Sequence, residues 1–66
     1  MKIGDIVKYT GASDGQKNYG RYTGNWNSIY VGFDYKVSDI EVHSWHTAIT
    51  LENIEGTFNS VCFEIL

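Results

Sequence analysis

The feature that most constrains the fold of this chain is the alternation of apolar with mostly polar residues in SIYVGFDYKV, residues 28–37. Apolar side chains recur there at every second position, namely Ile29, Val31, Phe33, Tyr35 and Val37. Because side chains on a β-strand point alternately to the two faces of a sheet, this pattern predicts a strand with one apolar face. No part of the chain shows a sustained helical periodicity, so the protein is expected to be built from strands.

Segments with strand-like composition lie on both sides of this run, and residues that favour turns separate them. The segments expected to contain strands are 2–11, 19–26, 39–49, 48–58 and 60–66. Residues 11–18 (GASDGQKN) are expected to form a loop, because Gly, Asp and Asn suit the backbone angles and side-chain hydrogen bonds of turns. The apolar parity changes after Ser44, so a bulge or a tight turn is expected at Ser44–His46.

Chain length limits what these strands can build. The 66 residues are enough for one domain, residues 1–66. A domain of this size buries only about 60% of the surface that its unfolded chain exposes. Five or six short strands without a long helix predict an all-β fold, a small antiparallel barrel. Closure of the barrel would also remove unpaired strand edges.

Charge is distributed unevenly along the chain. Eight acidic and five basic residues give a net charge of −3, and all five Lys and Arg residues precede Val37. Five of the acidic residues follow it. A net negative charge is atypical of nucleic-acid-binding proteins, whereas an acidic second half suits a partner with a basic surface.

Several classes of protein are disfavoured by what the sequence lacks. Cys62 is the single cysteine, so an internal disulfide is excluded. The first residues lack the apolar segment of a signal peptide, and no apolar run approaches the ~20 residues of a membrane span. A soluble cytoplasmic protein without a membrane partner is therefore expected.

The two ends of the chain carry short motifs of a known kind. Gly4–Lys8 (GDIVK) resembles the first strand of SH3-like barrels. The chain is also similar to small barrel proteins common in bacteriophage genomes, through Tyr19–Gly20 and Phe63–Ile65, whereas residues 23–59 depart from that pattern. The resemblance implies an SH3-like barrel and a phage or prophage accessory protein that binds host machinery, although a fold alone does not fix a function.

Potential metal ligands are concentrated in the segment DIEVHSWHTAI. His43 and His46 lie three positions apart, and Asp39, Glu41 and the more distant Cys62 are possible further ligands. Zinc requires three or four converging N, S or O ligands, but side chains at i and i+3 of an extended strand point to opposite faces. No metal ion and no other cofactor is therefore expected.

Nucleophilic catalysis has little support in the sequence. Cys62 lies between apolar residues near the end of the chain, where a free cysteine usually behaves as a small apolar side chain. No Gly-rich elbow is present to build an oxyanion hole beside it. The protein is predicted not to be an enzyme, and no catalytic residue is expected.

Aromatic residues make up 15% of the chain, more than a core of this size can hold. Trp26 lies in the polar segment GNWNS and is expected to be the most exposed of them, and Trp45 lies at the expected irregularity. Tyr and Trp are typical anchors of interfaces, and exposed acids steer a basic partner. The sequence therefore predicts a protein-binding module that engages a host protein through Trp26, Trp45, Asp39, Glu41 and His43.

Three alternatives stay open. Both tryptophans could cap the ends of the barrel and bind nothing. Arg21, Tyr22 and Trp26 could instead form an aromatic platform for single-stranded nucleic acid. In the third alternative, the protein is a homodimer in which the apolar patch of one copy covers that of the other.

Overall fold

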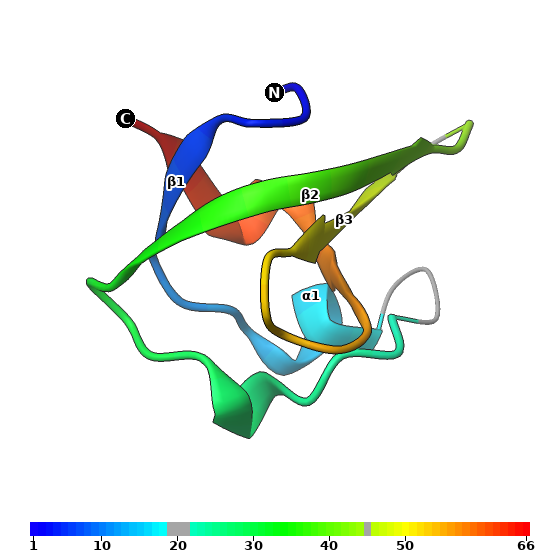
Figure 1. Cartoon of the computed structure of the whole chain (residues 1–66). Coiled ribbons are helices and arrows are strands. Elements are labelled where there is room, and N and C mark those ends of the chain that lie inside the picture. The colour runs from blue at the N-terminus through cyan, green and yellow to red at the C-terminus, as the bar shows by residue number, and fades with distance from the viewer. Residues whose placement is uncertain (19–21, 45) are drawn as a thin grey trace.

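The computed structural model describes residues 1–18, 22–44 and 46–66, and it shows five short strands with little helix (Figure 1). The strands are β1 (Ile6–Tyr9), β2 (Asp34–Val42), β3 (Thr47–Leu51), β4 (Thr57–Asn59) and β5 (Phe63–Ile65). The helical elements are α1 (Asp14–Asn18) and the 3-10 helices η1 (Trp26–Ser28) and η2 (Ser60–Cys62). The strands form one antiparallel sheet in the order β4-β3-β2-β1-β5. The predicted all-β fold is confirmed. Its shape is barrel-like, but the sheet does not close within the described residues.

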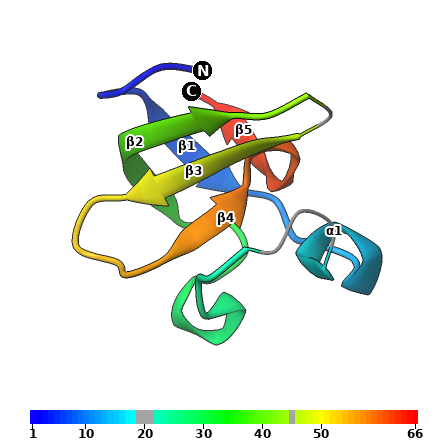
Figure 2. The same ribbon diagram turned by 90° about the vertical axis from the view of Figure 1, so that its right-hand side faces the viewer.

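Strand β2 joins the two halves of the sheet. Its first residues pair with β1, as in Ile6 with Lys36, and its later residues pair with β3, as far as Val42 with Thr47. The register shifts between Val37 and Asp39, so one extra residue enters β2 there. Such a bulge bends the strand and increases its twist, which lets β2 pass from one half to the other (Figure 2).

The core fills the space inside the curved sheet. Its buried side chains are Val7, Tyr9, Ile29, Val37, Ile49, Leu51, Phe58, Cys62 and Phe63. Aromatic rings connect the strands across this space: the Tyr9 ring lies 5.3 Å from Phe63, centroid to centroid, and Phe58 lies 6.3 Å from Phe63. These tilted and edge-on arrangements are the ones that aromatic quadrupoles favour. A core of this kind supplies the stability that isolated hairpins lack.

The run of alternation is only partly a strand, and the expectation for residues 29–33 is wrong. Strand β2 begins at Asp34, and the residues before it form a tight turn. The Phe33 N–H donates to the Tyr30 carbonyl at 3.2 Å, and Gly32 has φ +87°. A type II turn requires a positive φ at its third residue, which Gly provides without strain. This turn interrupts the alternation and leaves Val31 outside the core.

Residues 11–18 also differ from the expected loop, because Asp14–Asn18 form the short helix α1. A reciprocal pair of hydrogen bonds begins this helix. The Ser13 N–H donates to Gln16 Oε1 at 2.9 Å, and the Gln16 N–H donates to Ser13 Oγ at 3.3 Å. This is the capping box that Ser followed three residues later by Gln specifies, a signal present in the sequence.

The strand expected at residues 19–26 is not found in its described part, residues 22–26, and residues 19–21 lie outside the described residues. Thr23 instead bonds to the first residue of β4, Thr57. Each backbone N–H of this pair donates to the other residue's Oγ1 at 3.0 Å. The Gly24 N–H adds a bond to the Thr57 carbonyl at 2.8 Å. The segment therefore covers the edge of β4.

Candidate interaction surfaces

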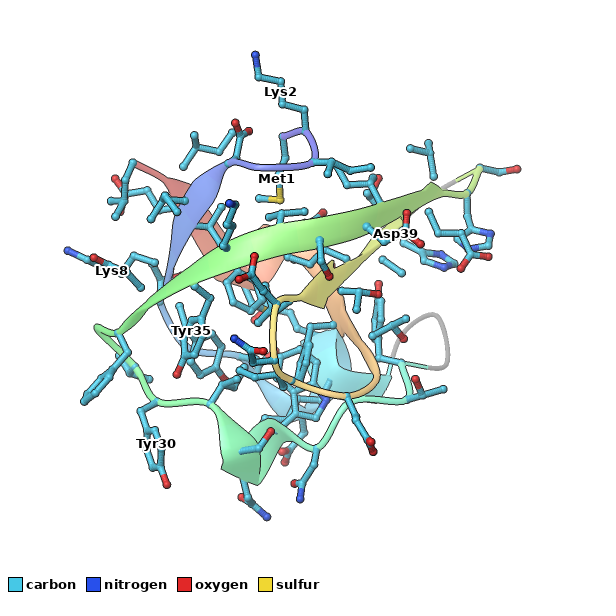
Figure 3. All side chains as sticks on the ribbon, in the orientation of Figure 1. Met1, Lys2, Lys8, Tyr30, Tyr35 and Asp39 are labelled. Carbon is cyan, nitrogen blue, oxygen red and sulfur yellow. The ribbon has the colours of Figure 1, made fainter. Side chains whose placement is uncertain are left out.

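The turn that precedes β2 carries three large apolar side chains on the surface. Tyr30, Val31 and Phe33 are 61%, 64% and 62% exposed, and we call them the apolar turn. The rings of Tyr30 and Phe33 lie 5.6 Å apart. Figure 3 shows Tyr30 pointing away from the sheet. Sequence reasoning does not identify the apolar turn as a site, because the alternation assigns Val31 and Phe33 to a buried strand face.

Hydrogen bonds fix the apolar turn to the sheet. The Tyr30 N–H donates to the Tyr35 hydroxyl at 2.8 Å. The Gly32 N–H donates to the Tyr9 carbonyl at 2.8 Å, and the Tyr9 N–H donates to the Phe33 carbonyl at 3.1 Å. Both ends of the turn are thus tied to β1 or β2, so the exposed side chains project from a backbone of defined shape.

A second surface lies at the other end of β2, on the hairpin formed with β3. Three predicted site residues, Asp39, Glu41 and His43, are exposed there. They occupy alternate positions and so share one face of the hairpin. Trp45, the fourth predicted residue of this segment, lies outside the described residues. The structure therefore brings together the acidic and histidine members of the predicted site.

The irregularity expected at Ser44–His46 is the turn of this hairpin, not a bulge within one strand. The His43 N–H donates to the His46 carbonyl at 2.9 Å. The two imidazole rings, expected on opposite faces, are stacked 4.5 Å apart at 23°. Glu41 Oε1 lies 3.2 Å from His43 Nε2. Within the described ranges, no group of three or more His, Cys, Asp or Glu side chains could hold a metal ion.

Trp26 does not lie on the surface as expected. It is partly buried against the core, and its ring meets Phe58 edge-on at 5.0 Å and Tyr9 at 6.1 Å. The cause is η1: Asn25 caps this 3-10 helix by accepting the Asn27 N–H at 2.9 Å, which turns the indole inward. The contacts favour the alternative in which Trp26 caps the core.

The nucleic-acid alternative rests on Arg21, Tyr22 and Trp26, and Tyr22 packs against other rings as Trp26 does. The Tyr22 ring packs edge-on to Trp26 at 6.3 Å and edge-on to His46 at 5.7 Å. Base stacking needs an accessible ring face, and the Trp26 ring already contacts Tyr9, Tyr22 and Phe58. Arg21 lies outside the described residues.

Cys62 is buried at 1% exposure in η2. Its Sγ lies 3.9 Å from Gln16 Oε1. Burial raises the pKa of the Cys62 thiol, against a smaller lowering effect of Lys17. A thiolate is the reactive form of cysteine, so the protonated, buried thiol suits a core position.

Comparison with known proteins relates the chain to a protein family. A family model described as bacteriophage T4 protein Y07B matches residues 29–66, more than half of the 66 residues. No curated protein and no solved structure matches the chain. The matched range contains the apolar turn and the β2–β3 hairpin. Most of the matched range falls within residues 23–59, which depart from the phage-protein motifs at the two ends of the chain. No SH3-like family is shown.

In the part of the chain that the structure describes, no helix is long and apolar enough to cross a membrane.

Proposed function

The chain belongs to the family of bacteriophage T4 protein Y07B, and on this basis we propose that it is a phage-encoded, non-enzymatic module that binds a protein of the bacterial host. The contact is made through the apolar turn, and the site of action is the host cytoplasm. Membership of a phage family supports a target inside the infected cell. The binding modulates the activity of the host protein to which the turn docks.

The observation that carries this proposal is the exposure of the apolar turn. Single exposed apolar residues are common on protein surfaces, but contiguous ones mark interaction sites. Tyr30 and Phe33 are in ring contact, and Val31 lies between them in the chain. Aromatic residues of this kind act as anchors that enter pockets of a partner. Because hydrogen bonds already fix the turn, little conformational entropy is lost when it docks.

The non-enzymatic part of the proposal rests on the placement of the reactive side chains. The Cys62 thiol is buried among core residues. The exposed imidazole of His43 and the partly buried imidazole of His46 lie on the β2–β3 hairpin and stack on each other. A nucleophile and its base must come within hydrogen-bond reach of one another, and the Cys62 thiol contacts the Gln16 side chain instead.

The proposal is tested by capture of host proteins on immobilised protein. The double variant Tyr30→Ser/Phe33→Ser should lose a partner that the wild type retains after nuclease treatment, because both anchors are removed. Truncation of an interface anchor typically costs about 2 kcal/mol or more, a factor of roughly 30 in affinity.

A matched pair of single variants provides the control. Val31→Ser and Val42→Ser make the same change at two exposed valines, 64% and 76% exposed, of which Val31 precedes β2 and Val42 is its last residue. Val31→Ser should weaken capture of the partner that Tyr30→Ser/Phe33→Ser loses, whereas Val42→Ser should not weaken capture of that same partner. Equal capture by all variants, with unchanged circular dichroism, would contradict the proposal, as would loss of every captured partner on nuclease treatment.

A further inference from the structure

The distal half of β2, residues 38–42, is paired on one side only. On the β1 side, the last backbone contacts are made at Val37, whose carbonyl accepts the Gly4 N–H at 2.8 Å and whose N–H donates to the Asp5 carbonyl at 2.9 Å. Past that point, β3 is the only strand paired with β2 among the described residues. The hairpin projects from the rest of the chain in Figure 1, so this side of β2 is an open edge.

The hydrogen-bond pattern shows which backbone groups face the open edge. In an antiparallel pair, hydrogen-bonded and non-hydrogen-bonded residue pairs alternate. The His43 N–H donates to the His46 carbonyl. The residues two and four positions earlier in β2, Glu41 and Asp39, are therefore also hydrogen-bonded to β3. Ile40 and Val42 therefore direct their N–H and C=O groups away from β3.

Asp39 occupies part of this edge. The Ile40 N–H donates to Asp39 Oδ1 at 2.9 Å, which agrees with an N–H that points away from β3. Charged side chains on an edge are a common means of blocking unwanted strand pairing. The Asp39 carboxylate thus holds a donor that an incoming strand would otherwise use.

We propose that the open edge of β2 accepts an extended, basic segment of a partner protein as an added strand. The acidic side chains of Asp39 and Glu41 share one face of this edge, and Ile40 and Val42 share the other. A segment that alternates Lys or Arg with apolar residues matches both faces, because opposite charges on neighbouring strands attract. A backbone carbonyl of the added segment accepts the hydrogen bond from the Ile40 N–H in place of the Asp39 carboxylate. The carboxylate is then free to pair with a basic side chain of the segment.

Charge also decides against a second copy of this chain on the same edge. Pairing of β2 with β2 of another copy would place acidic side chains among acidic side chains, and like charges on facing strands repel. The chain has no Lys or Arg after Lys36 that could relieve this repulsion from the hairpin. A basic partner is therefore the occupant that fits. This site lies apart from the apolar turn, as the positions of Tyr30 and Asp39 in Figure 3 show. The inference does not rest on docking through that turn.

The test uses a short synthetic peptide of alternating lysine and valine, with a peptide of alternating glutamate and valine as the control. Nuclear magnetic resonance titration of the full chain should shift the backbone amide signals of Ile40 and Val42 with the lysine peptide only. The variant Asp39→Lys/Glu41→Lys should bind the lysine peptide about tenfold more weakly, because two attractive pairs become repulsive. It should bind the glutamate peptide more tightly than the wild type does.

Two further variants distinguish strand addition at this edge from plain attraction between charges and from docking at the apolar turn. Val42→Pro removes an N–H on the open side while leaving the bonds to β3, and it should abolish binding of the lysine peptide. Tyr30→Ser/Phe33→Ser should leave that binding unchanged, so failure of the apolar-turn proposal would not affect this result. Equal binding of both peptides, shifts confined to amides outside the hairpin, or no binding at millimolar peptide would overturn the inference.

Discussion

Gly24 should be intolerant of any side chain, because the segment that contains it lies directly on β4. A Cβ atom added at Gly24 would meet the ring of Phe58 and would lie 2.6 Å from the Thr57 carbonyl oxygen. Phe58 is fully buried and cannot move away, and the carbonyl belongs to the backbone of β4. The substitution Gly24→Ala must therefore lift residues 22–24 from the strand.

The size of the effect follows from what that movement breaks. Three hydrogen bonds join this segment to Thr57: the Gly24 N–H to the carbonyl, and the two bonds that Thr23 and Thr57 exchange. At about 1 kcal/mol of net stability for each bond, the loss is roughly 3 kcal/mol, similar to the ~1–3 kcal/mol of an overpacked core. For a domain of this size, the melting temperature should fall by about 4–8 °C per kcal/mol.

Thermal and urea denaturation followed by circular dichroism would measure this change. Gly15→Ala is the matched control, because a Cβ there meets only Ser13 Oγ at 3.9 Å. Gly15 lies in α1, where Ala is favoured over Gly by up to about 1 kcal/mol. Gly15→Ala should keep or raise the melting temperature. If Gly24→Ala had the same melting temperature as Gly15→Ala, the packing of residues 22–24 on β4 would be refuted.

Three further changes in stability are expected. Burial raises the pKa values of Cys62 and Tyr9 above their usual 9.0 and 10.0; the folded state then holds these protons more tightly, so the free energy of unfolding should fall as the pH rises above 9. In urea titrations against pH, Cys62→Ala should show a shallower fall, and an identical slope would contradict the burial effect. Ser13→Ala should cost about 1 kcal/mol by removing the helix cap, whereas an unchanged urea midpoint would contradict the cap. Trp26→Ala should cost about 3 kcal/mol; a change in partner binding without a loss of stability would show that the indole is not a core residue.

The strand composition is a reliable guide to the fold class but not to where β2 begins. Alternation over residues 29–37 is compatible with one long strand, and the interruption depends on Gly32, whose φ of +87° ends the extended conformation. Because Gly occupies positive and negative φ almost equally, the sequence alone does not fix which is used. The apolar turn, the leading candidate site, escapes prediction for this reason.

Other features of the structure can be predicted from the sequence. The change of apolar parity from Val37 to Ile40 indicates the register shift that the structure places between Val37 and Asp39. The parity change near Ser44 correctly marks an irregularity, which is the hairpin turn. The inward placement of Trp26 could not be predicted, since a polar neighbourhood in the sequence does not reveal a capped 3-10 helix that rotates one side chain toward distant strands.

Photo-crosslinking inside the infected host cell would show whether the apolar turn docks on a host protein. A photoreactive phenylalanine analogue replaces either Phe33, in the apolar turn, or Val42, at the far end of β2. Docking through the turn predicts one discrete protein adduct from position 33 that disappears when Tyr30→Ser and Val31→Ser are added. An adduct that survives these substitutions, the same adduct in equal yield from position 42, or no protein adduct from position 33 would contradict docking through the apolar turn.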